Sequence, residues 1–161
     1  MINKIQIIVI LLLIPLGGLY WYSETQDITL HEMFFPSFKV MHIGDITHRV
    51  EIANTPEERA KGLSGRKVLS DRIDGMLFVF DETAYHQIWM KDMQFPIDII
   101  WISEDLEITQ IQKNVYPDSY PMTFRPNVPA RYAIETDTHY SDTYGIAPGM
   151  KVVLPLKYLE D

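Results

Sequence analysis

A nearly uninterrupted apolar segment at the N-terminus constrains this chain more than any other feature. Ile5 to Tyr22 is apolar except for Gln6, and as an α-helix it would reach about 27 Å, close to the thickness of a bilayer's hydrocarbon core. Lys4 precedes the segment and acidic residues follow it. Because positive charge stays on the cytoplasmic side, the sequence predicts a single-pass anchor in the cytoplasmic membrane, with the N-terminus inside and the remaining chain outside.

A cleaved signal peptide is the alternative to this anchor. Its cleavage site normally has small residues in an A-x-A-like pattern, whereas Gly18 to Ser23 contains no alanine. The retained anchor is therefore favoured, and either route exports the remaining chain. Because the chain contains no cysteine, disulfides, thiol catalysis and thiolate metal sites are excluded.

Charge and motifs narrow the partners and the chemistry. The formal net charge of −8 at pH 7 argues against nucleic acid and anionic lipid headgroups as partners. The chain has no nucleophile elbow, no glycine-rich phosphate loop and no H-E-x-x-H zinc motif. The five histidines are dispersed along the sequence, so we expect neither a metal site nor a bound cofactor.

Composition divides the chain into three parts. These are residues 1–22 as a signal anchor or transmembrane helix, 23–37 as a juxtamembrane linker, and 38–161 as a single β-rich domain. The domain opens with two alternating runs that flank Gly44-Asp45, which predicts a β-hairpin. The other predicted strands are residues 76–80, 86–90, 98–103, 106–113, 131–136 and 151–156.

Two short helices interrupt these strands. The first has Thr55 as N-cap, Pro56 at its first position, Glu58 in a capping box and Gly62 as its stop. The second is predicted over residues 138–144, and the proline-rich segment 116–129 is predicted to be a surface loop. Short strands without βαβ alternation favour a mostly β fold, a small antiparallel sandwich or barrel with two short helices.

The densest polar cluster within an apolar region lies between residues 89 and 98. Trp89, Lys91, Asp92 and Asp98 could meet at one end of a sheet. They would form a cleft with an indole wall, an ammonium group and two carboxylates, suited to a polar or sugar-like ligand. The alternative is a loop in which Asp92 and Asp98 cap backbone amides and Lys91 pairs with one of them.

Glu135 is the remaining carboxylate of interest, on an alternating strand that places Arg131 and Ala133 on its face. It could pair with Asp98, as two carboxylates do in glycan hydrolysis. The alternative is a cross-strand ion pair with Arg66 or Lys91.

Several of these segments, taken in order, resemble the uncharacterised family known as domain of unknown function 192. The resemblance spans about Val50 to Val153 and rests on four stretches, which are residues 55–63 with Arg66, 75–80, 89–91 followed by 96–99, and 130–135 with Gly145-Ile146 and Gly149. It implies a compact β-sandwich of jelly-roll-like character and supplies no activity. This chain departs from the family at Ser64, usually Met, and at Asp92-Met93, usually Asn-Thr.

Three functions remain open. The leading hypothesis is a membrane-anchored, extracytoplasmic, non-enzymatic module of the cell envelope. It would bind a polar ligand, a glycan or a protein through Trp89, Lys91, Asp92, Asp98, Arg66 and Glu135. The second is a carboxylate-dependent hydrolase of envelope polysaccharide that uses Asp98 and Glu135, and the third is an accessory subunit of a membrane protein assembly.

Overall fold

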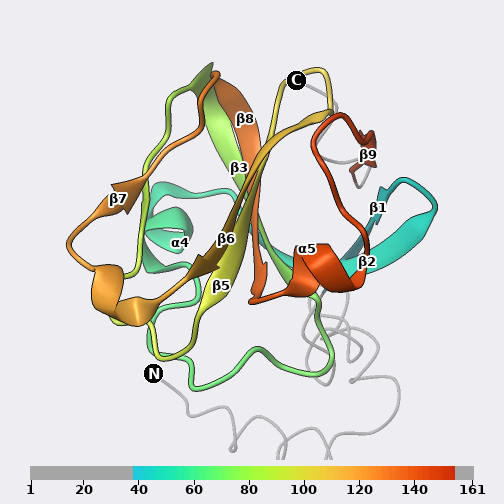
Figure 1. Ribbon diagram of the computed structural model, residues 1–161. Helices are drawn as coiled ribbons and strands as arrows, with labels where there is room; N and C mark the ends of the chain where they lie inside the picture. Colours follow the sequence, from blue (N-terminus) through green and yellow to red (C-terminus); the bar gives the residue numbers. More distant parts are fainter. Residues whose placement is uncertain (1–37, 155–161) are drawn as a thin grey trace, which may run out of the picture. The chain divides into compact units, whose positions relative to one another are not determined.

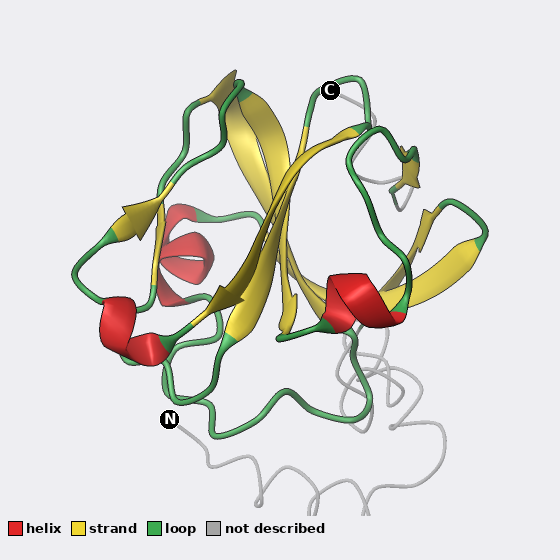
Figure 2. Ribbon diagram, viewed as in Figure 1, coloured by secondary structure: helices red, strands yellow, loops and turns green. Residues whose placement is uncertain are grey.

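The computed structural model describes residues 38–154. The predicted anchor and juxtamembrane linker lie outside the described residues. Between 38 and 154, no helix has the length and apolar character needed to cross a membrane. The described part of the domain is mostly β, a strongly curled seven-stranded sheet with two short helices and a separate pair of strands (Figures 1 and 2).

The elements follow the chain in this order: β1 (Lys39–Ile43), β2 (Ile46–Ala53), α4 (Pro56–Lys61), β3 (Gly75–Ala84), β4 (Ile88–Trp89), β5 (Ile97–Ile102), β6 (Ile108–Val115), the 3₁₀ turn η1 (Pro117–Ser119), β7 (Thr123–Phe124), β8 (Ala130–Asp137), α5 (Tyr140–Thr143) and β9 (Val152–Val153).

The strand order in the large sheet is β6-β5-β8-β3-β2-β1-β9. All its neighbours are antiparallel except β2 and β3, which run parallel in the register Val50↔Gly75 to Ala53↔Phe78. The mostly β character was predicted correctly, but the expected antiparallel sandwich or barrel is instead a mixed sheet that curls into a half-barrel. The reason is that α4 and the loop after it carry the chain back to the end of the sheet at which β2 began, so β3 starts beside β2 in the same direction.

Local sequence signals account for the first helix. Thr55 caps α4, its side chain accepts from Glu58 N–H, and the Glu58 side chain accepts from the Thr55 N–H. Each bond satisfies an amide that would otherwise lack a partner at the helix start. The predicted capping box is confirmed, as are Pro56 in the first turn and Gly62 as the C-cap.

The proline-rich segment after β6 is more ordered than a bare loop. It contains η1 and β7, and β7 pairs with β4 in the register Ile88↔Phe124 and Trp89↔Thr123. This short strand fits between Pro121 and Pro126, so no proline has to donate to the ladder. The pairing places the exposed indole of Trp89 beside the proline-rich segment.

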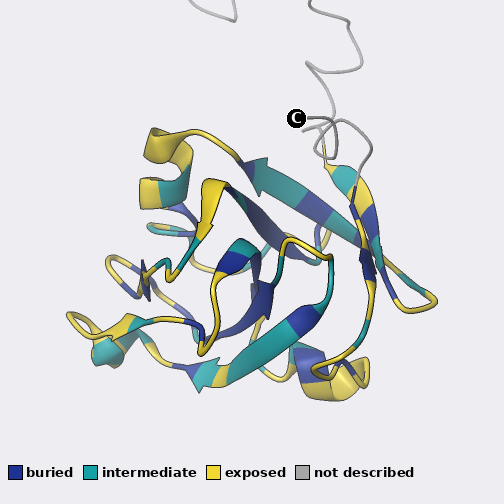
Figure 3. Ribbon diagram, turned by 90° about the horizontal axis from the view of Figure 1, so that it is seen from above, coloured by how far each residue is buried: buried dark blue, intermediate teal, exposed yellow. Residues whose placement is uncertain are grey.

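The curled sheet carries an apolar cluster on each face. Figure 3 shows that buried residues lie along the strands of this sheet. One cluster includes Phe78 and Trp101 and is covered by the residues after α4 and by the β4–β7 pair, and we call this side the α4 face. The other includes Leu77 and Ile100 and is covered by α5 and β9, and we call it the α5 face. Because side chains alternate along a strand, neighbouring residues of β3, β5 and β8 belong to opposite faces.

Candidate functional site

A cavity of about 270 Å³ opens on the α4 face, between the end of α4 and strands β3, β4 and β7. Its apolar walls are Leu63, Phe78, Phe80, Ile88, Trp89 and Met93. The polar groups that line it are Arg59, Lys61, Ser64, Gln87, Thr123 and Glu135. Apolar walls with a few polar groups are typical of a site for a small molecule.

Glu135 is the buried acid of this cavity. Strand pairing places it in one row with Glu51 of β2, Met76 of β3 and Ile99 of β5. This row lies on the α4 face, so the carboxyl group stands among apolar side chains. Only 4% of the residue is exposed.

One oxygen of this carboxyl group has no hydrogen-bond partner among residues 38–154. The group accepts a hydrogen bond from the Leu63 backbone N–H, but Oε2 is buried without a hydrogen bond. Burial raises the pKa of Glu135 to about 8, against the opposing effects of the Leu63 bond and the nearby Arg66 charge. Glu135 is therefore mostly protonated at neutral pH and can give up its proton near physiological pH.

Gly62 leaves room above this carboxyl group. Its φ is +47°, a conformation that favours glycine. A Cβ here would lie 3.0 Å from Phe78 Cζ and 3.3 Å from Glu135 Oε2. The residue that ends α4 therefore also keeps the space beside the buried acid open.

Two arginines near the cavity each have a carboxylate partner. Arg66 forms a bidentate pair with Glu51, at 3.2 Å and 2.5 Å. Arg59 pairs with Asp81 at 2.7 Å and also donates to two backbone carbonyls. Neither is hydrogen-bonded to Glu135, so the expected ion pair of Glu135 with Arg66 is reduced to a weaker electrostatic attraction.

The predicted cluster around residues 89–98 is divided by the fold. Trp89 is 46% exposed and lines the cavity. Lys91 and Asp92 form an exposed turn beside it, held by their backbone carbonyls, which accept from Ser64 Oγ at 2.7 Å and from Gly65 N–H at 2.8 Å. This turn adjoins the cavity, but neither Lys91 nor Asp92 lines it.

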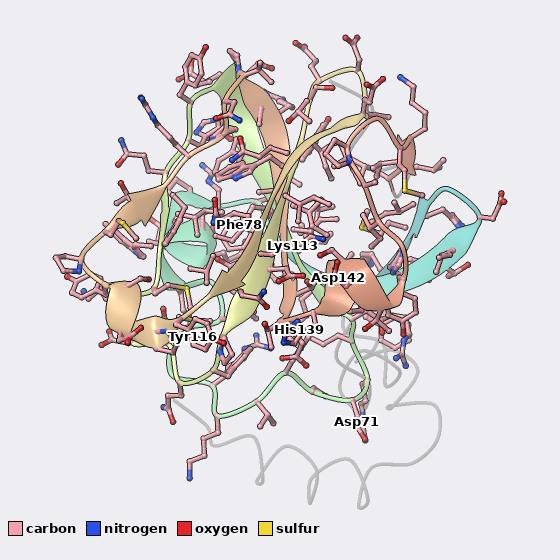
Figure 4. The ribbon with its side chains drawn as sticks, in the orientation of Figure 1. Asp71, Phe78, Lys113, Tyr116, His139 and Asp142 are labelled. Carbon is pink, nitrogen blue, oxygen red and sulfur yellow. The ribbon has the colours of Figure 1, made fainter. Side chains whose placement is uncertain are left out.

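Asp98 lies on the α5 face and not with the others. It is fully buried and accepts from Asn114 N–H at 2.9 Å and from the Ser141 N–H and hydroxyl at 3.1 Å and 2.6 Å. The alternative of an aspartate that caps backbone amides is the correct one here. Figure 4 shows Phe78 near α4, and Asp142 and His139 at α5.

The expectation that Asp98 and Glu135 share one cleft was wrong. Asp98 pairs across the sheet with Thr136, the residue after Glu135. Because neighbouring strand residues point to opposite faces, the sheet itself separates the two carboxyl groups. The carboxylate pair required by the hydrolase hypothesis is not formed.

Sequence reasoning missed most of the cavity wall, including Gly62, Ser64, Phe78 and Phe80. One signal was available, because three consecutive apolar residues, Tyr132, Ala133 and Ile134, precede Glu135 and make both faces of this part of the strand apolar. A strand that is buried on both faces leaves no solvent for a carboxylate. The glutamate therefore had to stand in the core.

A second buried polar group lies on the α5 face. His48 Nδ1 is hydrogen-bonded with the Tyr140 hydroxyl at 2.5 Å, while Nε2 has no partner. Burial lowers the pKa of His48, against the attraction of Asp74. The adjoining space is only about 10 Å³, room for about one water.

Within residues 38–154, no group of three or more acidic, histidine or cysteine side chains is placed to hold a metal.

Comparison with known proteins identifies the family. The profile of DUF192, described as "Uncharacterized ACR, COG1430", matches residues 39–154, and the chain belongs to this family. No curated protein matches the chain.

Two solved structures are similar to the chain. A protein of unknown function from Novosphingobium aromaticivorans DSM 12444 has 28% identity and a TM-score of 0.66, over 71% of this chain and 84% of the other. A candidate transcription regulator from Sinorhizobium meliloti 1021 has the same identity and TM-score, over 72% and 92% of the two chains.

Proposed function

We propose that this domain is a non-enzymatic binding module that takes a small ligand into the Glu135 cavity. The observation that carries the proposal is Oε2 of Glu135, which lines the cavity and is buried without a hydrogen-bond partner among residues 38–154. A buried polar atom without a hydrogen bond costs about 1–3 kcal/mol. A ligand that supplies the missing bond would recover part of that cost.

The lining residues favour binding over catalysis. Glu135 is the only carboxylate among the described residues that line the cavity, and none of these residues is a histidine. Hydrolysis by paired carboxylates needs two such groups within about 10 Å across one cleft. Ser64 lines the cavity too, but its hydroxyl donates to the Lys91 carbonyl, so no base activates it as a nucleophile.

The membrane context forms part of the proposal. The apolar run from Ile5 to Tyr22, with Lys4 before it, supports a domain tethered outside the cytoplasmic membrane. The ligand would then be a small molecule of the cell envelope, or the exposed end of a glycan or protein. A protease added to intact cells should remove the domain, whereas cleavage only after lysis would contradict this topology.

An accessory role in a membrane protein assembly is a second candidate. Tyr116, Tyr120 and Met122 precede β7 and are each about half exposed. Exposed apolar residues that are close in the chain are typical of a protein-binding surface. Substitution of all three by serine would weaken such a contact and leave small-molecule binding unchanged.

Ligand binding can be tested on the full chain in phosphatidylcholine nanodiscs with ¹³C-methyl methionine. Met93 lines the cavity, whereas Met41 is buried on the α5 face. Phenethylamine or 2-phenylethanol at millimolar concentration should shift the Met93 methyl signal and leave that of Met41 in place. Trp89→Ala should reduce the affinity at least about threefold, and Tyr116→Ala is the matched control at an exposed aromatic residue. If neither probe moves Met93, the proposed function is wrong.

A further inference from the structure

The residues around Glu135 also point to the chemical class of the ligand. We infer that the cavity binds a small organic cation, a protonated amine on a flat apolar body, whose N–H groups donate to Glu135 Oε2. This inference rests on the proposed function and adds to it the charge and shape of the ligand.

Two acids beside the cavity share one cation. Glu51 and Glu135 stand in one row across β2, β3 and β8, and Arg66 is the cation close to both. Both terminal nitrogens of Arg66 donate to Glu51. Two acids therefore share one guanidinium group, and Arg66 alone does not balance both carboxylates when Glu135 is ionised.

The aromatic walls of the cavity suit a flat cation. Phe78 and Trp89 line the cavity that holds the buried acid. Aromatic faces attract cations, by about 0.5–2 kcal/mol for each contact, and they also pack against a flat apolar group. A space of about 270 Å³ accommodates a ligand on the order of ten non-hydrogen atoms.

Two cationic side chains of α4 also line the cavity, and they do not oppose this assignment. Arg59 is already paired with Asp81 at 2.7 Å. Lys61 is exposed, so solvent and salt screen its charge. The formal net charge of −8 on the whole chain attracts cations at longer range.

A cationic ligand has a characteristic pH dependence here. The charge that acts on Glu135 is that of Arg66, which is paired with Glu51. Arg59 and Lys61 of α4 line the same cavity. Because Glu135 is mostly protonated below about pH 8, an amine that binds its carboxylate must displace that proton. The affinity should therefore rise about tenfold per pH unit from about pH 6 to 7.5, and level off above about pH 8. A neutral hydrogen-bond acceptor would show the opposite trend, because it needs the protonated acid.

The test compares phenethylamine with 2-phenylethanol, which differ only in the amino and hydroxyl groups. With the full chain in phosphatidylcholine nanodiscs at about pH 7.5, the amine should bind at least about tenfold more tightly than the alcohol. Calorimetry in buffers of different ionisation enthalpy should show the release of about one proton at pH 7. Empty nanodiscs correct for partition of the probes into lipid.

Glu135→Gln should abolish both the preference for the amine and the pH dependence, while Glu57→Gln, an exposed position on α4, should change neither. Binding of 2-phenylethanol shows whether the cavity of the Gln variant is intact, and the wild-type pH profile needs no variant at all. Equal binding of the two probes, or affinity that falls as the pH rises, overturns the amine inference and leaves the proposed function standing. Failure of both probes to bind overturns both.

Discussion

Asp98 and Glu135 are buried acids of adjacent strands with opposite surroundings. Asp98 on the α5 face accepts three hydrogen bonds, whereas Oε2 of Glu135 on the α4 face accepts none. A carboxyl group with all its bonds made holds the fold together. One with a free oxygen in a cavity costs stability and remains available to a ligand. The number of partners, more than the residue type or the depth of burial, separates a structural acid from a candidate site.

The largest expected difference between the two acids is the pH dependence that Glu135 gives to the free energy of unfolding. Its pKa in the folded domain is about 8, above the ordinary value of 4.5, so the protonated form is the one that suits the fold. The contribution of the protonated Glu135 to the free energy of unfolding is fully present below about pH 4.5, and it is lost as the pH rises to about 8. The pKa difference amounts to roughly 5 kcal/mol.

This loss is measured by urea unfolding of the full chain between about pH 4 and 9. Glu135→Gln keeps the shape of the neutral acid, and its free energy of unfolding should not show this loss as the pH rises. Wild type and variant with parallel stability curves would show that Glu135 is not a buried, protonated acid.

The second effect concerns the other acid. Asp98→Ala leaves the amides of Asn114 and Ser141 and the Ser141 hydroxyl without their acceptor in the core. We expect a loss of about 4 kcal/mol in the free energy of unfolding. Asp118→Ala, at an exposed position, should stay within about 0.5 kcal/mol. A loss below about 1 kcal/mol for Asp98→Ala would mean that its hydrogen bonds do not make Asp98 a structural acid.

The smallest effect separates backbone strain from crowding at the cavity. Gly62 and Gly65 both have positive φ, at +47° and +77°, but a Cβ would crowd Phe78 and Glu135 only at Gly62. Gly65→Ala should cost about 1 kcal/mol from strain alone. Gly62→Ala should cost about 1 kcal/mol more and also weaken probe binding. Equal losses in urea unfolding, with unchanged probe affinity, would mean that Gly62 does not shape the cavity.

The sequence predicted features that depend on nearby residues. Both ends of the helix α4 were predicted correctly, because its signals, Thr55, Pro56, Glu58 and Gly62, act within the helix itself. The hairpin of β1 and β2 follows from alternation on both sides of Gly44. Such signals lie within one or two turns of chain, and tertiary packing does not alter them here.

Features that depend on distant partners were not predictable. The parallel pairing of β2 with β3 depends on where the long connection returns. The face occupied by Asp98 depends on the register between β5 and β8. Trp89 and Glu135 were predicted as site residues, and both line the cavity. That Asp98 lies on the opposite face of the sheet is clear only from the structure. That any of these residues binds a ligand stays a prediction.

The two bonds between the segment after α4 and the turn at Lys91-Asp92 have a further consequence. Ser64 and Gly65 donate to the carbonyls of that turn, and Ser64 also lines the cavity. The two segments are therefore joined beside the cavity, and they cannot separate from each other without loss of both bonds. If the domain binds a ligand as proposed, these two bonds favour molecules that fit the cavity at its present width.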